Sequence, residues 1–189
     1  MRYVVLLLAV FLLPGAALAQ SSTPGTDGQV PDGSTLETEP PMTFERLGDI
    51  VRVLDAEAIF RGPTIELTIA DIPVIIIADP RADRMRAMVP IRAAEGLEPD
   101  ELMRLMQANF DSALDARYAV AQGRLWGVFI HPLSPLESEQ FVSGLAQTVN
   151  VARTYGQTYS GGAQVFGGGD SNGIYEGLLD ELRKKGEEL

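Results

Sequence analysis

Residues 64–91 read TIELTIADIPVIIIADPRADRMRAMVPI, and this stretch decides the fold. It begins with alternating apolar and polar residues, the pattern of a strand that buries one face. A β-branched run with no polar side follows, and then a third apolar segment that is expected to close at Pro90. Strands are predicted at 64–69, 74–78 and 84–91, with turn residues between them. The stretch therefore predicts a three-stranded antiparallel meander.

Helical patterns flank the meander. Thr43 is the expected N-cap of a first helix, whose apolar residues recur at helical spacing as far as Leu54. Pro99 is expected at the first position of a second helix. The apolar stripe of that second helix is predicted to comprise Leu102, Leu105, Met106 and Asn109-Phe110.

A second hairpin and a third helix complete the pattern. Strands are predicted at 116–121 and 124–131, joined by Gln122-Gly123. Ser134–Glu137 has the form of a capping box, so the third helix is expected to begin there and to stop at Gly156. The predicted order is α-β-β-β-α-β-β-α. We therefore expect an α+β fold in which an antiparallel sheet packs against helices.

Composition divides the chain into five predicted segments. These are a signal peptide (1–19), a disordered linker (20–42), a folded domain (43–159), a Gly-rich linker (160–173) and a C-terminal amphipathic helix (174–189). The first linker is rich in Ser, Thr, Gly, Pro and acidic residues, so it buries too little apolar surface to offset chain entropy. The C-terminal helix is expected to dock on the domain or on a partner.

The N-terminus predicts export. Arg2 precedes an apolar run that ends at Pro14, and Ala17-Leu18-Ala19 suits a signal peptidase. Cleavage after Ala19 would leave a periplasmic or secreted chain with no stable membrane insertion. The alternative is a retained membrane anchor, which would need about 20 apolar residues, roughly twice the length of this run.

Charge and cysteine content limit the classes of function. The chain has no cysteine, which excludes disulfides, thiol catalysis and cysteine metal ligands. Its formal net charge of −11 opposes binding to nucleic acid and to anionic membranes, because like charges repel.

One charged turn contains the strongest candidates for ligand binding. Asp79 and Asp83 flank Arg81, and Arg84 and Arg86 follow. Two carboxylates could perform acid–base chemistry or bind a hard cation, but in a β-turn such residues commonly serve the turn itself. The three arginines are the candidates for contact with an anion or a partner. Alternation places Arg84 and Arg86 on one face of the third strand.

No motif predicts a catalytic residue, a cofactor or a metal site. His131 is the only histidine, and no G-x-S-x-G elbow supports a Ser-His-Asp triad around it. Residues 167–173 (GGGDSNG) lack the ligands of a calcium loop, and their composition favours a linker. We therefore predict a protein that is not an enzyme, with an unrecognised hydrolase as the least favoured alternative.

The element order resembles the type III secretion chaperone-like fold, and within it the YbjN-type domains described as sensory transduction regulators. The similarity covers Thr43–Tyr159 and rests on element order and hydrophobic pattern. The segments that carry it are the first helix, Ile72–Ile76, Leu102–Arg117, Arg124–Trp126 and the helix from Ser134. The resemblance implies a dimer that binds polypeptide segments. Because the secretion chaperones act in the cytoplasm, the export signal of this chain argues against delivery of clients to a secretion machine.

Two predicted strands support a binding surface independently. Val74–Ala78 and Leu125–Ile130 are apolar on both faces, so one face can pack on helices while the other needs cover. The cover would be a second copy of the chain, another protein or the C-terminal helix; alternatively, both faces are buried within one protomer. Trp126 is a candidate partner contact, although its orientation is undecided by sequence. We therefore expect an exported, homodimeric protein-binding module, with a small-anion sensor that uses the arginine-rich turn as the alternative.

Overall fold

The structure is a computed structural model, and it describes residues 39–111, 115–156 and 172–186. The predicted signal peptide, nearly all of the first predicted linker and most of the Gly-rich segment lie outside these residues. No helix in the described part of the chain is long and apolar enough to cross a membrane.

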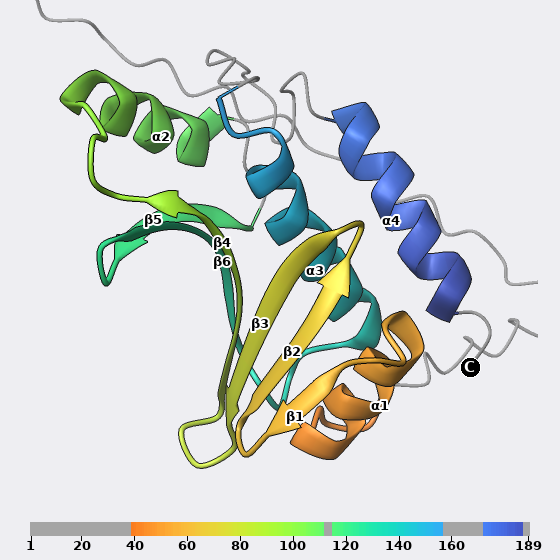
Figure 1. Cartoon of the computed structure of the whole chain (residues 1–189). Coiled ribbons are helices and arrows are strands. Elements are labelled where there is room, and N and C mark those ends of the chain that lie inside the picture. Colours follow the sequence, from red (N-terminus) through yellow and green to blue (C-terminus); the bar gives the residue numbers. More distant parts are fainter. Residues whose placement is uncertain (1–38, 112–114, 157–171, 187–189) are drawn as a thin grey trace, which may run out of the picture. The chain divides into compact units, whose positions relative to one another are not determined.

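The α+β prediction is confirmed: a six-stranded antiparallel sheet packs with four helices in the described residues (Figure 1). The elements are α1 (Phe44–Leu54), β1 (Ile59–Arg61), β2 (Thr64–Ile69), β3 (Ile72–Asp79), β4 (Arg84–Ala93), α2 (Pro99–Asp111), β5 (Arg117–Ala121), β6 (Arg124–Pro132), α3 (Ser138–Arg153) and α4 (Asn172–Gly186). The strand order in the sheet is β1-β2-β3-β4-β6-β5. The predicted meander therefore gains a short edge strand, β1.

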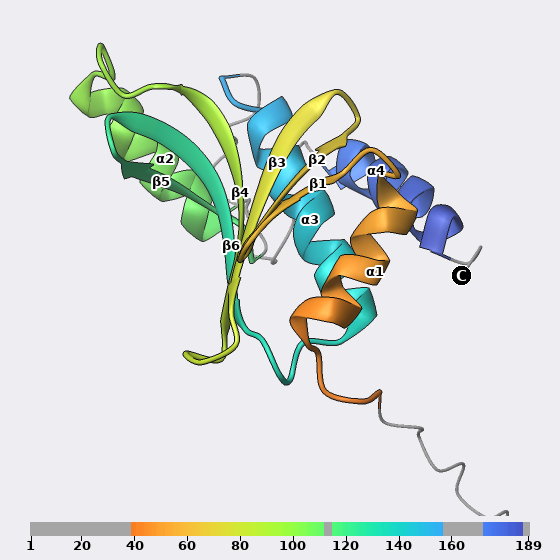
Figure 2. The ribbon, with the colours of Figure 1, turned by 60° about the horizontal axis from the view of Figure 1, so that its bottom comes forward.

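Two local features differ from the predicted strand boundaries. The β2–β3 turn needs only Ala70 and Asp71, which both have positive φ (49° and 64°), so β3 starts at Ile72. Pro90 does not close β4, because a register shift between Pro90 and Arg92 accommodates the missing N–H and the strand continues. Figure 2 shows β4 and β6 curving together away from the β3–β4 turn toward α2.

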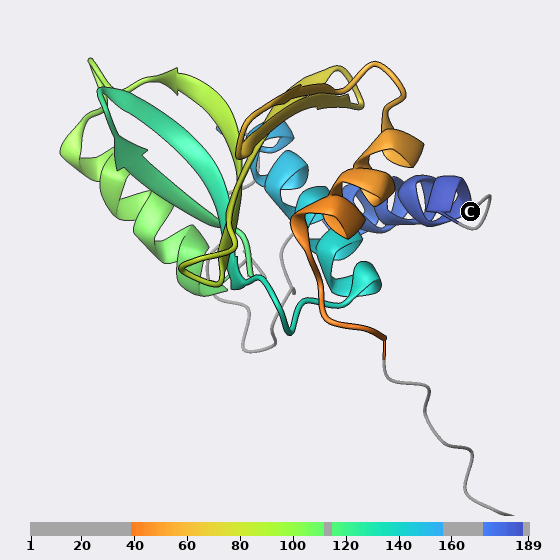
Figure 3. The same ribbon diagram turned by 90° about the horizontal axis from the view of Figure 1, so that it is seen from below.

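The main core lies between the sheet and α3. Phe141, Leu145 and Val149 project from α3 onto buried residues of β3, β4 and β6. Gly144 allows a close approach, since a Cβ there would lie 2.5 Å from the ring of Phe129. Figure 3 shows α1, α3 and α4 together on one side of β1–β4, with α2 at the far end beside β5.

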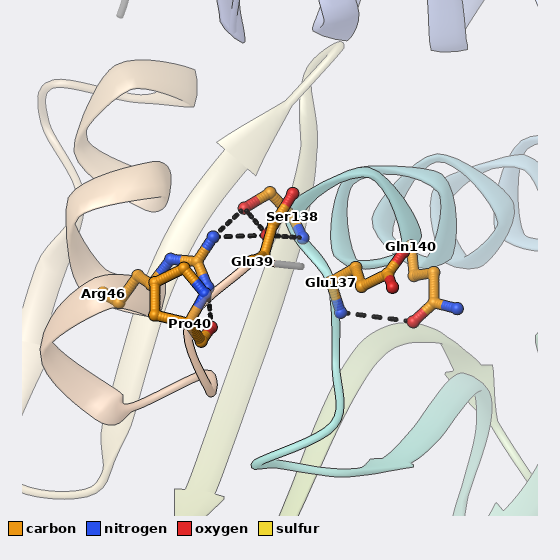
Figure 4. A network of polar contacts seen from close by, with 6 residues as sticks. All are labelled: Glu39, Pro40, Arg46, Glu137, Ser138 and Gln140. Carbon is orange, nitrogen blue, oxygen red and sulfur yellow. Dashed lines mark hydrogen bonds and ion pairs between the residues drawn. The ribbon is translucent and has the colours of Figure 1, made fainter. Parts of the chain in front are cut away.

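The predicted start of the third helix is wrong by one turn. Ser134 does not cap it, because its N–H and its hydroxyl both donate to the carboxylate of Asp83, at 2.7 and 2.8 Å. The helix begins at Ser138, and the side chain of Gln140 accepts a hydrogen bond from the N–H of Glu137. A distant acceptor completes the cap, because Glu39 takes hydrogen bonds from the N–H and hydroxyl of Ser138 (Figure 4).

Glu39 also joins α1 to α3. Arg46 of α1 donates to the Glu39 carboxylate and to the hydroxyl of Ser138 (Figure 4). The bonds from Ser138 and from Arg46 lower the pKa of Glu39. Met42 is 2% exposed and belongs to the main core. Residues 39–42 are therefore part of the folded structure and not of the linker to which the sequence assigned them.

The predicted apolar stripe of α2 is right at Leu105 and wrong at Leu102, Met106 and Phe110. Leu105 and Ala108 are buried, whereas Leu102, Met103, Met106 and Phe110 are exposed. The reason is that α2 packs against the edge strand β5. The side chain of Asn109 bonds both the N–H and the carbonyl of Tyr118, at 2.7 and 3.1 Å.

The C-terminal helix α4 docks on the domain. Leu178, Leu179 and Leu182 are buried in the main core, against α3 and α1. Arg183 bonds Glu139, and the hydroxyls of Tyr175 and Ser143 lie 2.8 Å apart. Because α4 sits on the helices, it does not cover the opposite face of the sheet.

Candidate binding face of the sheet

The side chains that point away from the helices form a second surface, which we call the open face. In β4, Met85, Ala87 and Val89 are buried, so the intervening residues point the other way. The open face carries the apolar residues Ile75, Ile77, Met88, Trp126, Val128 and Ile130. No helix that the structure describes packs against it.

Strand register gathers the apolar residues at the centre of the open face. Ile75, Met88 and Val128 stand side by side across β3, β4 and β6. In the next row, Arg86 lies between Ile77 and Ile130. Ile77 is 39% exposed and Ile130 is 53% exposed. The centre is therefore a contiguous aliphatic patch that reaches solvent.

Arginines surround this patch. The open face carries five arginines and two acidic residues, namely Arg61, Arg84, Arg86, Arg117 and Arg124 with Glu66 and Asp79. One pair is internal, because the guanidinium of Arg61 lies 3.3 Å from the carboxylate of Glu66. The face is thus net positive on a chain whose formal charge is −11. That difference marks it for a negatively charged partner.

A cavity of about 430 Å³ opens on this face beside the β3–β4 turn. Ile77, Ala82, Met85 and Ile130 form its apolar part, and Asp79, Arg84 and Arg86 form its charged part. The structure gives neither Arg84 nor Arg86 an ion pair or a side-chain hydrogen bond with the residues it describes.

The two carboxylates of this turn serve the turn itself. One oxygen of Asp79 accepts from the backbone N–H groups of Arg81 and Ala82, at 2.9 and 3.2 Å. Asp83, with a positive φ of 50°, is held by Ser134. The hydrogen bonds from Ser134 lower the pKa of Asp83, and the charge of Arg84 adds to that effect. These contacts agree with the prediction that the two carboxylates serve turn geometry rather than catalysis.

The predicted contact residues fall into three places. Arg84 and Arg86 share the cavity. Arg81 lies in the turn and does not line it. Trp126 lies on the open face and outside the core, four residues from Ile130 and so about 13 Å along β6. Its indole N–H donates to the carbonyl of Ala121 at 3.0 Å, and Arg124 lies 5.9 Å from its ring centre.

His131 lies elsewhere, on the helix side of β6. It lines a cavity of about 510 Å³ together with Asp115, Glu139 and Ser143, and this cavity also reaches Arg117 and Ile130 of the open face. Its ring stacks on Phe129, and Nδ1 lies 2.8 Å from the carbonyl oxygen of Pro132. The hydroxyl of Ser143 bonds Tyr175 and Gln147 rather than the imidazole. No group of three or more potential metal-ligating His, Cys, Asp or Glu occurs among the described residues.

The two strands predicted to have a second apolar face contain Ile77 and Ile130 without singling them out, and Met88 was missed as a surface residue. Their signal was the strand alternation itself, since each precedes or follows a buried neighbour by one position. Alternation does not give the strand register, and it is the register that places these residues side by side.

No protein-family model matches the chain, and no curated protein matches it. The open face is therefore interpreted from its own chemistry.

Proposed function

We propose that this protein is an exported, non-enzymatic protein-binding module that holds a polypeptide against the open face of its sheet. The observation that carries the proposal is the patch around Met88 and Val128, which is aliphatic, fringed by arginine and left uncovered by the described helices. Trp, Met and Arg are enriched in the cores of protein interfaces, whereas Lys is depleted. All the basic residues of the open face are arginine.

The resemblance to YbjN-type domains and to type III secretion chaperones supports the same class of function. The coarse α+β arrangement, an antiparallel sheet with helices on one side, is compatible with this resemblance. We also propose, from the predicted export signal, that binding takes place outside the cytoplasm.

We place the proposed homodimer interface at α2 and not at the open face. Two open faces brought together would oppose arginine to arginine, which costs energy as the surface is desolvated. The outer side of α2 is apolar instead: Met103 is 60% exposed, Met106 is 53% exposed and Phe110 is 83% exposed. These residues recur at positions i, i+3 and i+7, so two α2 helices packed antiparallel would bury them against each other.

The test is binding of a permanently unfolded, acidic model protein, followed by fluorescence. Trp126 is the only tryptophan of the chain and lies on the proposed surface, so its emission reports occupancy directly. We expect a saturable change for the unaltered protein and none for Ile130→Glu, which places a carboxylate in the aliphatic patch.

Met106→Glu is the matched control, because it puts the same charge on the other exposed apolar surface. It should leave the Trp126 response intact. If Met106→Glu abolished binding and Ile130→Glu did not, the open face would be the wrong surface.

A small-anion sensor is the second candidate, and one observation favours it. Arg84 and Arg86 line a cavity without an ion pair to a described residue. A sensor of this kind would be thermally stabilised by inorganic phosphate or acetate alone, and Arg84→Ala would remove that stabilisation.

A further inference from the structure

We propose that the cavity at the β3–β4 turn binds a carboxylate carried next to an aliphatic side chain on the partner polypeptide. This inference rests on the proposed function and names the chemistry of the partner. It makes Arg84 and Arg86 the residues that select the partner, and the aliphatic patch the surface that holds it.

The carboxylates near the cavity already accept hydrogen bonds from within the domain. Asp79 accepts hydrogen bonds from two backbone N–H groups of the turn, and Asp83 accepts them from Ser134. Arg61, at the other side of the same face, has Glu66 as its partner. Arg84 and Arg86 face the cavity without an equivalent partner in the described residues. A guanidinium that is desolvated by a docked partner needs an anion from that partner.

The cavity is lined by both apolar and cationic side chains. Ile77 and Ile130 stand on either side of Arg86 in the strand register, so apolar and cationic groups alternate within one row. A free anion would leave the isoleucines in water, and a purely aliphatic segment would desolvate Arg86 without compensation. A chain with an acidic residue beside an aliphatic one satisfies both groups at once.

A second copy docked through its own open face is an unsuitable occupant. A copy docked through the same face would present five arginines and two acidic residues to an identical set. The occupant must instead be acidic, and its charge would steer it to the net-positive open face of an acidic protein.

The experiment uses three synthetic peptides of about ten residues, roughly 33 Å when extended. One alternates glutamate and valine, the second replaces each glutamate by glutamine, and the third replaces each by lysine. Binding to the full mature chain is followed by Trp126 fluorescence and by calorimetry. We expect the glutamate peptide to bind about tenfold or more tightly than the glutamine peptide, and the lysine peptide to bind least.

The double variant Arg84→Gln/Arg86→Gln should reduce the affinity for the glutamate peptide to that for the glutamine peptide. Arg153→Gln is the control, because Arg153 is an exposed arginine of α3 away from the sheet. Both variants should keep a melting temperature close to that of the parent, since these side chains make no described hydrogen bond or ion pair and the effect of the Arg84 charge on the exposed Asp83 is screened by solvent.

Failure of this inference and failure of the proposed function give different results. Equal binding of the glutamate and glutamine peptides would overturn carboxylate recognition and leave the open face as a binding surface. Absence of any Trp126 response to all three peptides and to the unfolded model protein would overturn both. If acetate bound as tightly as the glutamate peptide, the ligand of the cavity would be a small anion and not a polypeptide.

Discussion

Among single residues, two glycines determine how closely α3 lies to the sheet. A Cβ on Gly144 would lie 2.5 Å from the Phe129 ring, and one on Gly127 would lie 2.6 Å from Val151. Each glycine lacks a Cβ that would collide with a side chain of the other element, so α3 and β6 can lie in direct contact. Neither requirement is visible in sequence, because each depends on a neighbour from a different element.

Gly144→Ala should lower the free energy of unfolding by about 1–3 kcal/mol, as overpacking of a rigid ring contact does. Gly177→Ala in α4 is the matched control, since a Cβ there meets nothing within 4 Å. It should stabilise by up to about 1 kcal/mol through helix propensity. Chemical denaturation of both variants measures the difference, and equal stabilities would contradict the packing described.

Glu39 is the residue whose protonation should matter most for the α1–α3 connection. Its hydrogen bonds from Ser138 and Arg46 lower its pKa below the usual 4.5. A carboxyl group with a lowered folded pKa contributes its stability above the unfolded pKa, and that contribution is lost as pH falls through the folded value.

Glu39→Gln should therefore cost less than about 1 kcal/mol at pH 7, because the exposed carboxylate is screened by solvent, and progressively less as the pH falls below 4.5. Glu57→Gln, at an exposed position in the α1–β1 turn, should change stability little at either pH. Urea unfolding curves between pH 7 and pH 3 test this. A pH-independent loss in Glu39→Gln would show that charge is not involved.

At the scale of elements, α4 is a structural helix of the domain. Leu182 is fully buried, and the neighbouring Lys184 is exposed. Leu182→Ala should lower the free energy of unfolding by about 2–5 kcal/mol, and Lys184→Ala should leave it nearly unchanged. If Leu182→Ala were neutral in thermal unfolding, α4 would not be docked in solution.

The element α2 should control self-association. Phe110→Glu places a charge at the most exposed position of the exposed apolar residues of α2, so it should convert the proposed dimer to a monomer. Ile130→Glu, on the open face, should remain dimeric. Sedimentation velocity at several concentrations distinguishes the two. A monomeric unaltered protein would remove the proposed dimer while leaving the open face untouched.

Element boundaries show how far sequence reasoning reaches. Thr43 caps α1 as predicted, because its hydroxyl accepts from Arg46 three residues away. Ser134 carried an equally good local signal, but Asp83 binds it and the helix starts later. Local signals are therefore reliable only where no distant residue competes. The burial pattern of α2 was mispredicted for the same reason, because its buried residues pack on β5, on Leu125 of β6 and on Val151 of α3.

The candidate site was predicted in part. Alternation placed Arg84 and Arg86 together, and both line one cavity. Trp126 could not be assigned to core or surface, because Leu125–Ile130 is apolar on both faces. The register of β6 with β4 decides it, by setting Trp126 opposite Pro90 on the open side.

At the scale of the whole molecule, the charge of the open face and its aliphatic patch are proposed to have different roles in binding. The positive face should attract an acidic partner from a distance, and the aliphatic patch should retain it after contact. Raising salt from about 0.05 to 0.5 M should slow association of the glutamate peptide several-fold with the unaltered protein. The Arg84→Gln/Arg86→Gln variant should show little salt dependence in the same stopped-flow measurement. Identical salt dependence in both proteins would contradict steering by these arginines.

The most direct test of the central claim is photocrosslinking in the native host, with a photoreactive amino acid at Ile130 on the open face. The same probe at Glu176, an exposed position of α4, is the control. The account predicts a discrete adduct with another protein from position 130 alone, which disappears in the Arg84→Gln/Arg86→Gln background. Adducts from position 176 and none from position 130 would contradict the claim, because the partner would then bind at α4 and not at the open face.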